Sequence, residues 1–143
     1  MRHFRCARRF LRLLAIVALF AAEAACAAPF AYISNEGDGT LSVIDIAVNA
    51  VVATVPVGAL PFGVAVNPTG NFVYVTNVGS NTVSVVDTAT KAVVATVPVQ
   101  LVPRGVAITP TGALAYVTNQ GSNTVSVINT ATNTVVATMR CVR

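Results

Sequence analysis

Histidine, tryptophan and cysteine are scarce in this chain of 143 residues, which contains one His, no Trp and three Cys. His3, Cys6 and Cys26 all lie within the N-terminal segment 1–28, so Cys141 is the only one of these side chains beyond that segment. Zinc sites and the Ser/His/Asp and Cys/His catalytic arrangements depend on such side chains. We therefore predict no metal site, no cofactor and no enzymatic activity for the chain beyond that segment.

Charge is also scarce, at 10% of the residues, and it is unevenly distributed. The net charge of +4 comes from the segment 1–28, which holds five arginines and one acidic residue. In the rest of the chain the bases and acids balance: Lys91, Arg104, Arg140 and Arg143 against Glu36, Asp38, Asp45 and Asp87. Nucleic-acid binding draws its affinity from a basic surface. We expect no nucleic-acid partner.

The segment 1–28 has the three parts of a secretory signal peptide: an arginine-rich start, an apolar run at 13–22, and small residues before Pro29. The apolar run is shorter than the roughly 20 residues that a membrane-spanning helix needs. We predict a helical signal peptide over 1–28, cleaved after Ala27 or Ala28. The product is exported to the periplasm, the extracellular space or the cell surface, without a stable transmembrane anchor.

Three features of the termini leave alternatives open. Cys26 could accept a lipid, although the large aliphatic residue usual three positions before a lipoprotein cysteine is missing. Arg8 and Arg9 resemble a twin-arginine signal with the spacing off by one. Cys141 could join two chains by a disulfide, or be a bystander near the end of the chain.

After the leader, the chain repeats itself at a fixed period of 42, which is the spacing of Tyr32, Tyr74 and Tyr116. These tyrosines begin three aligned copies without insertion or deletion, YISNEGDGTLSVIDIAVNAVVATVPV, YVTNVGSNTVSVVDTATKAVVATVPV and YVTNQGSNTVSVINTATNTVVAT. Periods of about 40 residues are typical of propeller blades and solenoid turns. We predict one repeat domain at 29–143, with the units 30–71, 72–113 and 114–139.

Turn-forming residues divide each unit into four short apolar runs, which in the central unit are 63–67, 72–77, 82–87 and 92–99. These runs are rich in β-branched Val and Thr and show no helical polar face, so they favour strands. Several are apolar at consecutive positions, which indicates a sheet covered on both sides. The pattern predicts an all-β fold of four-stranded antiparallel propeller blades.

The recurring words carry a resemblance to a known family. YVTN at 74–77 and 116–119 is followed by GSNTVSV and VVATV, and the units also contain P-x-G-V-A and NPTG or TPTG. In these words the chain resembles the YVTN family of β-propeller repeats over 30–139. The resemblance implies a secreted or cell-surface protein of bacteria or archaea, in a family that often has about seven blades. Related propellers include lactonase-like and quinoprotein-like enzymes, so the resemblance implies the fold and leaves the activity open.

The repeats are too few to close a ring. The domain begins at the second strand of a blade, because 30–35 aligns with 72–77, and it ends after the fourth strand of the third unit. This is about 2.7 blades, against the roughly 4 to 8 of closed propellers. Each end unit should then expose an apolar face, which calls for a partner surface. Self-association of two chains and the missing blades of a longer propeller both remain open.

Positions that differ between the copies mark a candidate partner face. By analogy with the family, the loop after the second strand and the loop entering the first strand open on the same side of the ring. Loops on a rigid scaffold tend to carry function. The variable positions in these loops, taken as the candidate partner-binding residues, are Glu36, Asp38, Phe62, Val78, Arg104 and Gln120.

Two sets of acidic residues invite a chemical interpretation, and we favour a structural one for each. The loop NEGDGT around Glu36 and Asp38 could hold Ca²⁺ weakly, but it supplies few of the six or more oxygens that calcium takes. Asp45 and Asp87 recur where the third unit has Asn129, which predicts a side-chain oxygen that caps a turn.

Together these observations predict an exported, non-enzymatic β-propeller-repeat protein that serves as a binding or structural module of the cell envelope. Its protein or envelope partner is unknown. The alternative is a fragment or subunit of a propeller enzyme of lactonase or quinoprotein type.

Overall fold

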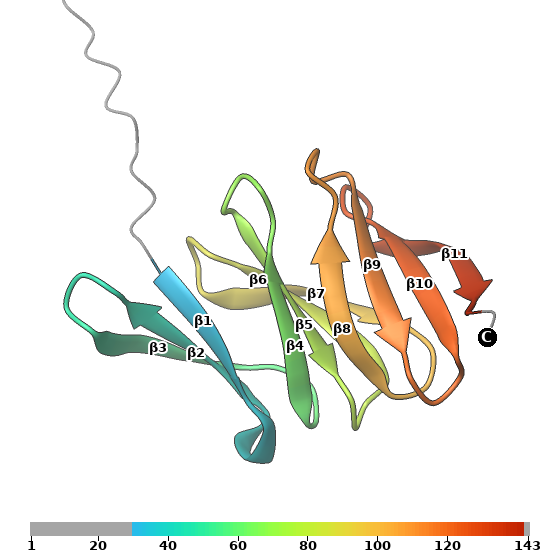
Figure 1. Cartoon of the computed structure of the whole chain (residues 1–143). Coiled ribbons are helices and arrows are strands. Elements are labelled where there is room, and N and C mark those ends of the chain that lie inside the picture. Colours follow the sequence, from blue (N-terminus) through green and yellow to red (C-terminus); the bar gives the residue numbers. More distant parts are fainter. Residues whose placement is uncertain (1–29, 142–143) are drawn as a thin grey trace, which may run out of the picture.

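Residues 30–141 are described by a computed structural model, in which they form three antiparallel sheets side by side in chain order (Figure 1). Blade 1 contains β1 (Phe30–Asn35), the short 3-10 helix η1 (Glu36–Asp38), β2 (Thr40–Asp45) and β3 (Ala50–Pro56). Blade 2 contains β4 (Pro61–Val66), β5 (Phe72–Asn77), β6 (Thr82–Asp87) and β7 (Ala92–Pro98). Blade 3 contains β8 (Pro103–Ile108), β9 (Leu114–Asn119), β10 (Thr124–Asn129) and β11 (Thr134–Arg140).

The sequence prediction of an all-β partial propeller is confirmed in this part of the chain. Blades 2 and 3 each have four strands in chain order, whereas blade 1 has three, with no strand equivalent to β4 and β8 among residues 30–141. The predicted helical signal peptide, with Cys26 and the twin-arginine pair, lies outside the described residues. No helix within residues 30–141 is long and apolar enough to cross a membrane.

Each blade has the same internal register, including its irregularities. The pairing of the last two strands shifts register once in every blade. The shift falls between Val43 and Ile44 in blade 1, at Val85/Val86 in blade 2 and at Val127/Ile128 in blade 3. Such a bulge adds local twist to the sheet. Because the bulge recurs at the repeat spacing, the three sheets share one curvature and can stack on one another.

Two hydrophobic clusters hold the blades together. The cluster between blades 1 and 2 contains Leu41, Val43, Val55, Val73, Val75 and Val86. The cluster between blades 2 and 3 contains Tyr74, Val83, Val85, Val97, Ala115, Val117 and Ile128. In β5, alternate residues therefore face opposite neighbours, with Val73 and Val75 toward blade 1 and Tyr74 toward blade 3. The consecutive apolar residues of β5 and β6 reflect cover on both sides, as the sequence predicted.

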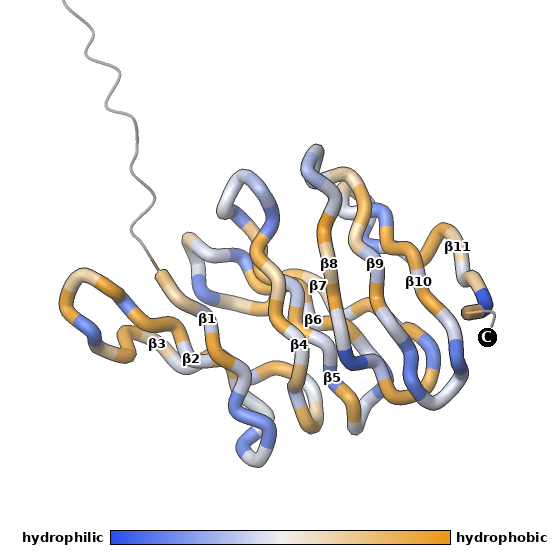
Figure 2. Tube along the Cα trace, viewed as in Figure 1, coloured by the Kyte–Doolittle hydropathy of each residue, from blue (hydrophilic) through white to orange (hydrophobic). Residues whose placement is uncertain are grey.

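The outer sides of blades 1 and 3 carry the same kind of residues. The C-terminal face, on the outer side of blade 3, carries Tyr116, Val125, Val127 and Met139, which align with the buried Tyr74, Val83, Val85 and Val97. The N-terminal face, on the outer side of blade 1, carries Ala31, Ile33, Ile44 and Val51. Figure 2 shows the apolar colour running through the strands of the end blades as well as the central one.

Candidate partner-binding site

A hydroxyl group joins blade 1 to the first strand of blade 2, and blade 2 to the first strand of blade 3. Thr76 Oγ1 accepts a hydrogen bond from Gly63 N in its own blade (2.8 Å) and donates one to the carbonyl oxygen of Arg104 in blade 3 (2.6 Å). Ser34, one repeat earlier, donates to the carbonyl oxygen of Phe62 in blade 2 (2.8 Å). Thr118, one repeat later, accepts from Gly105 N (2.9 Å) and lies exposed on the C-terminal face. The hydroxyl position is therefore fully used only in blade 2.

Sequence reasoning missed these three hydroxyls. Their signal is a Ser or Thr directly before the Asn of every YVTN-type word, a position where Val would be equally compatible with a strand. A polar residue at one fixed position of each unit, within an otherwise apolar run, indicates a hydrogen bond that recurs with the repeat.

An asparagine fixes the turn between the second and third strands of each blade. The amide nitrogen of Asn77 donates to Thr82 Oγ1 and Ser84 Oγ, both at 3.0 Å. Asn35 and Asn119 make the same pair of bonds in blades 1 and 3. The recurring asparagines therefore hold the turn between the second and third strands in all three blades.

The carbonyl end of this asparagine differs between blades. Asn77 Oδ1 accepts a hydrogen bond from Gly58 N at 3.1 Å. Asn119 Oδ1 is buried without a partner among the described residues. A Cβ at Gly58 would lie 2.6 Å from Asn77 Cγ, and the residue one repeat after Gly58 is Gln100, which carries a Cβ. The backbone at Gln100 therefore cannot approach Asn119 as closely as Gly58 approaches Asn77.

The loops that carry the candidate partner-binding residues lie along one edge of the blades, the lower edge in Figure 1. Backbone hydrogen bonds tie them in pairs, with Val78 N donating to Leu60 O and Gln120 N to Val102 O, each at 2.9 Å. The loop after the second strand thus packs on the loop that enters the first strand of the same blade. Val78 and Gln120 belong to such pairs.

Phe62 and Arg104 lie at the start of neighbouring first strands and contact each other. The guanidinium carbon of Arg104 is 4.8 Å from the centre of the Phe62 ring, a cation–π distance. Both side chains are exposed. Glu36 and Asp38 are also exposed, on η1, and no group of three or more His, Cys, Asp or Glu side chains that could hold a metal occurs among residues 30–141.

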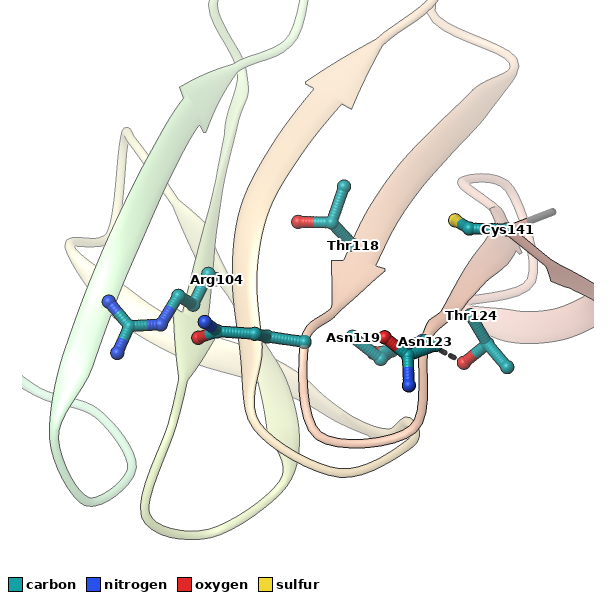
Figure 3. Close-up of a pocket in the computed structure, with 7 residues that line it drawn as sticks. Arg104, Thr118, Asn119, Asn123, Thr124 and Cys141 are labelled. Carbon is teal, nitrogen blue, oxygen red and sulfur yellow. Dashed lines mark hydrogen bonds between the residues drawn. The ribbon is translucent and has the colours of Figure 1, made fainter. Parts of the chain in front are cut away.

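A pocket of about 330 Å³ opens at the end of blade 3 (Figure 3). It is lined by Arg104, Thr118, Asn119, Gln120, Asn123, Thr124 and Cys141. The blade 2 residue aligned with Asn123 is Asn81, and Asn81 Oδ1 accepts a hydrogen bond from Val102 N in blade 3 (2.9 Å). The pocket is therefore lined by Asn123, whose equivalent one repeat earlier, Asn81, binds the following blade.

The acidic residues Asp45 and Asp87 cap turns, as the sequence predicted. Asp87 Oδ1 accepts hydrogen bonds from Thr90 N (2.8 Å) and Ala89 N (2.9 Å), and these bonds hold the pKa of the carboxyl below its usual value. Asp45 accepts from Ala47 N (2.8 Å). Asn129 makes the same contacts in blade 3 with an uncharged oxygen. The position needs an acceptor, and a charge is optional.

The three antiparallel blades, one of three strands and two of four, stack face to face in chain order. This arrangement defines this part of the chain as a segment of a β-propeller. Residues 26–139 match the family described as "Lactonase, 7-bladed beta-propeller". The chain belongs to this family. No curated protein matches the chain.

Solved structures support the same fold. The chain is similar to a structure titled "Kuenenia stuttgartiensis Hydrazine Synthase", with 34% identity and a TM-score of 0.75 over 76% of this chain and 32% of that one. A structure titled "Dihydro-heme d1 dehydrogenase NirN in complex with DHE" matches at 20% identity and a TM-score of 0.72, over 81% of this chain and 25% of that one. A further similarity, with 16% identity and a TM-score of 0.64 over 76% of this chain and 31% of that one, is to apo AztD from Citrobacter koseri. The chain thus spans a third or less of these relatives.

Proposed function

We propose that this protein is an exported, non-enzymatic binding or structural module of the cell envelope, of the YVTN repeat type, which works by adding further blades to its C-terminal face. The observation that carries this proposal is the match between that face and the buried surface of blade 2. Tyr74 and Val97 are 1% and 2% exposed, whereas the aligned Tyr116 and Met139 are 36% and 47% exposed. Burying such apolar area is the main driving force for association.

The N-terminal face offers a matching surface. Ile33 on blade 1 aligns with Val75 and Val117, which are fully buried against the preceding blade. Ile33 itself is 50% exposed. The C-terminal face and the N-terminal face repeat the two sides of each blade-to-blade contact, except for the first strand, which blade 1 lacks among the described residues. A second copy placed head to tail would therefore reproduce the part of that contact made by the other three strands. Such a head-to-tail contact closes only if the rotation between copies completes a ring.

Light scattering tests this assembly, with the full chain kept in reducing buffer so that Cys141 cannot crosslink it. We expect a dimer or a larger assembly. Met139→Lys should reduce the mass to that of a monomer, since its equivalent Val97 is buried between blades. Val136→Lys is the matched control, because its equivalent Val94 remains 53% exposed within blade 2. A soluble wild-type monomer with cooperative melting contradicts the proposal.

The candidate loops supply the envelope contact in this proposal. Arg104 and Phe62 form an aromatic and cationic pair at the edge where the variable loops gather. Pull-down from an envelope fraction with Glu36→Ala and Arg104→Ala tests these loops. Unchanged recovery of every bound protein by both variants would retire them as the contact surface.

The second candidate is a part of a propeller enzyme of lactonase or quinoprotein type, and the family match favours it. Against it, Asp45 and Asp87 are engaged in turns and the described residues bring no carboxylate cluster together. Hydrolysis of lactones by the purified full chain, followed by proton release, separates the candidates. Turnover above the uncatalysed rate favours the enzyme, and its abolition by Glu36→Gln or Asp38→Asn would identify the carboxylate used.

A further inference from the structure

We propose that the open edge of β1 binds an extended strand from another polypeptide of the same repeat type, with the sequence Pro-x-Gly-Val-Ala followed by Val or Ile. The open edge of β1 is the side of Phe30–Asn35 that faces away from β2. In blades 2 and 3 the equivalent strands β5 and β9 are paired on this side with β4 and β8. Blade 1 has no such strand among the described residues. Exposed strand edges are templates for pairing with another chain.

The backbone groups available for pairing can be identified from blade 2. Asn67 N donates to Phe72 O (2.9 Å) where β4 meets β5. Hydrogen-bonded pairs alternate along an antiparallel ladder, so the next such pair is Ala65 with Tyr74. Tyr32 occupies the same place in blade 1. Its N–H and C=O therefore face the open edge, while those of Ile33 face β2.

The side chain of Ser34 adds a second contact for the incoming strand. In blades 2 and 3 the equivalent hydroxyls of Thr76 and Thr118 accept a hydrogen bond from Gly63 N and Gly105 N, the glycines of the first strand. Ser34 Oγ already donates to Phe62 O, and a hydroxyl oxygen keeps two acceptor lone pairs. Ser34 can thus accept the N–H of a glycine placed as Gly63 and Gly105 are.

The neighbouring blade explains why that residue must be glycine. A Cβ built on Gly63 would collide with the carbonyl oxygen of Arg104, which lies on the first strand of blade 3. By the repeat, the glycine of a strand added to β1 would lie against the carbonyl oxygen of Phe62 on β4. The site therefore selects a strand with glycine as its third residue, and any side chain there is excluded.

The leader does not carry this sequence. Residues 19–24, one repeat before β4, read LFAAEA, with Ala21 at the glycine position and Glu23 at the position of Ala65. Ala21 would bring the excluded Cβ against Phe62 O. Another polypeptide with a P-x-G-V-A strand therefore fits the site better than the chain's own leader.

A peptide of the chain's own sequence tests the proposal. The probe is residues 100–109, QLVPRGVAIT, labelled with a fluorophore and titrated with the full chain while anisotropy is recorded. We expect saturable binding, and at least tenfold weaker binding of the matched peptide with Gly105→Val. Absence of binding, or equal binding of the two peptides, overturns the proposal.

Amide hydrogen exchange then places the bound peptide. We expect the Tyr32 amide to become protected and the Ile33 amide to remain unchanged. Protection confined to Thr118 and the C-terminal face contradicts the proposal. Ser34→Ala should weaken binding by about threefold to tenfold, the range of one hydrogen bond. Thr118→Ala, which removes the hydroxyl at the aligned position two blades away from the site, is the control, and an equal effect of the two variants also overturns the assignment.

The two proposals fail separately. A chain that is monomeric in light scattering but binds the peptide at β1 refutes assembly through the C-terminal face and leaves strand addition intact. A chain that assembles but does not bind the peptide refutes strand addition at β1 and leaves assembly through the C-terminal face intact.

Discussion

Thr76 Oγ1 lies 2.6 Å from the carbonyl oxygen of Arg104, and this hydrogen bond joins the middle of one blade to the first strand of the next. Thr76 is fully buried, and the same oxygen also accepts from Gly63 N. One side chain thus satisfies two backbone groups that belong to two different sheets. This hydrogen bond is directional, so it orients blade 3 relative to blade 2 at an interface that otherwise consists mainly of apolar side chains.

Replacement of Thr76 by Val should destabilise the protein by about 1–3 kcal/mol, because it leaves Gly63 N and Arg104 O, both in part-buried positions, without their hydrogen-bond partner. Denaturant unfolding followed by circular dichroism measures the change. Thr118→Val is the matched control, with an expected effect of no more than about 0.5 kcal/mol because Thr118 is exposed. Equal losses for the two variants would show that the bond between blades contributes nothing beyond strand pairing.

Substitution of Gly63 by Ala should cost about 1–3 kcal/mol through overpacking, since the new methyl group would collide with Arg104 O. Gly37→Ala is the control, because a Cβ at Gly37 meets no atom within 4 Å. The midpoint of thermal unfolding should fall for the first variant and stay close to wild type for the second. An unchanged midpoint for Gly63→Ala would mean that blades 2 and 3 can move apart without loss.

Asp87 should make the stability of the protein sensitive to acid. Its folded pKa is lowered by hydrogen bonds from Thr90 and Ala89, so its stabilising effect is present above the unfolded pKa and is lost as the pH falls through the folded value. Asp87→Asn keeps an acceptor, as Asn129 does in blade 3. Unfolding free energies measured from neutral pH down to about pH 2 should fall less steeply for Asp87→Asn than for wild type. Superimposable pH profiles would contradict this assignment.

Tyr74 should make the protein sensitive to alkali. Burial raises the pKa of its phenol above 10.0, since the charged form is poorly solvated between the blades. The stabilising effect is present below the unfolded pKa and is lost as the pH rises through the folded one. Tyr74→Phe should reduce the loss of stability above pH 10.0, measured by unfolding at a series of alkaline pH values. An equal loss in the variant and wild type would show that Tyr74 ionises without disturbing the fold.

The sequence predicted the strands because its period and its turn residues act locally. Asn77 donates hydrogen bonds to Thr82 and Ser84, five and seven residues away, so both partners of these turn contacts lie within the same repeat unit. The Asp87 turn is likewise complete within four residues. Such short-range contacts can be inferred from spacing alone.

The contacts between blades could not be derived in the same way. Thr76 and Arg104 are 28 residues apart, and which atoms meet depends on the distance between two sheets. Asn119 Oδ1 has no partner among the described residues in the repeat where Gln100 replaces the glycine that Gly58 supplies to Asn77, and no pattern of hydrophobicity records such a difference. Phe62 and Arg104 were singled out because they vary, and the structure adds that they stack on each other.

The aligned bulges and the unbroken repeat period have a consequence at the level of the gene. Recombination between two copies at aligned points yields a product that keeps the strand register and the bulge of the unit. The number of blades can therefore change by whole units while the strand pairing of each remaining blade is kept.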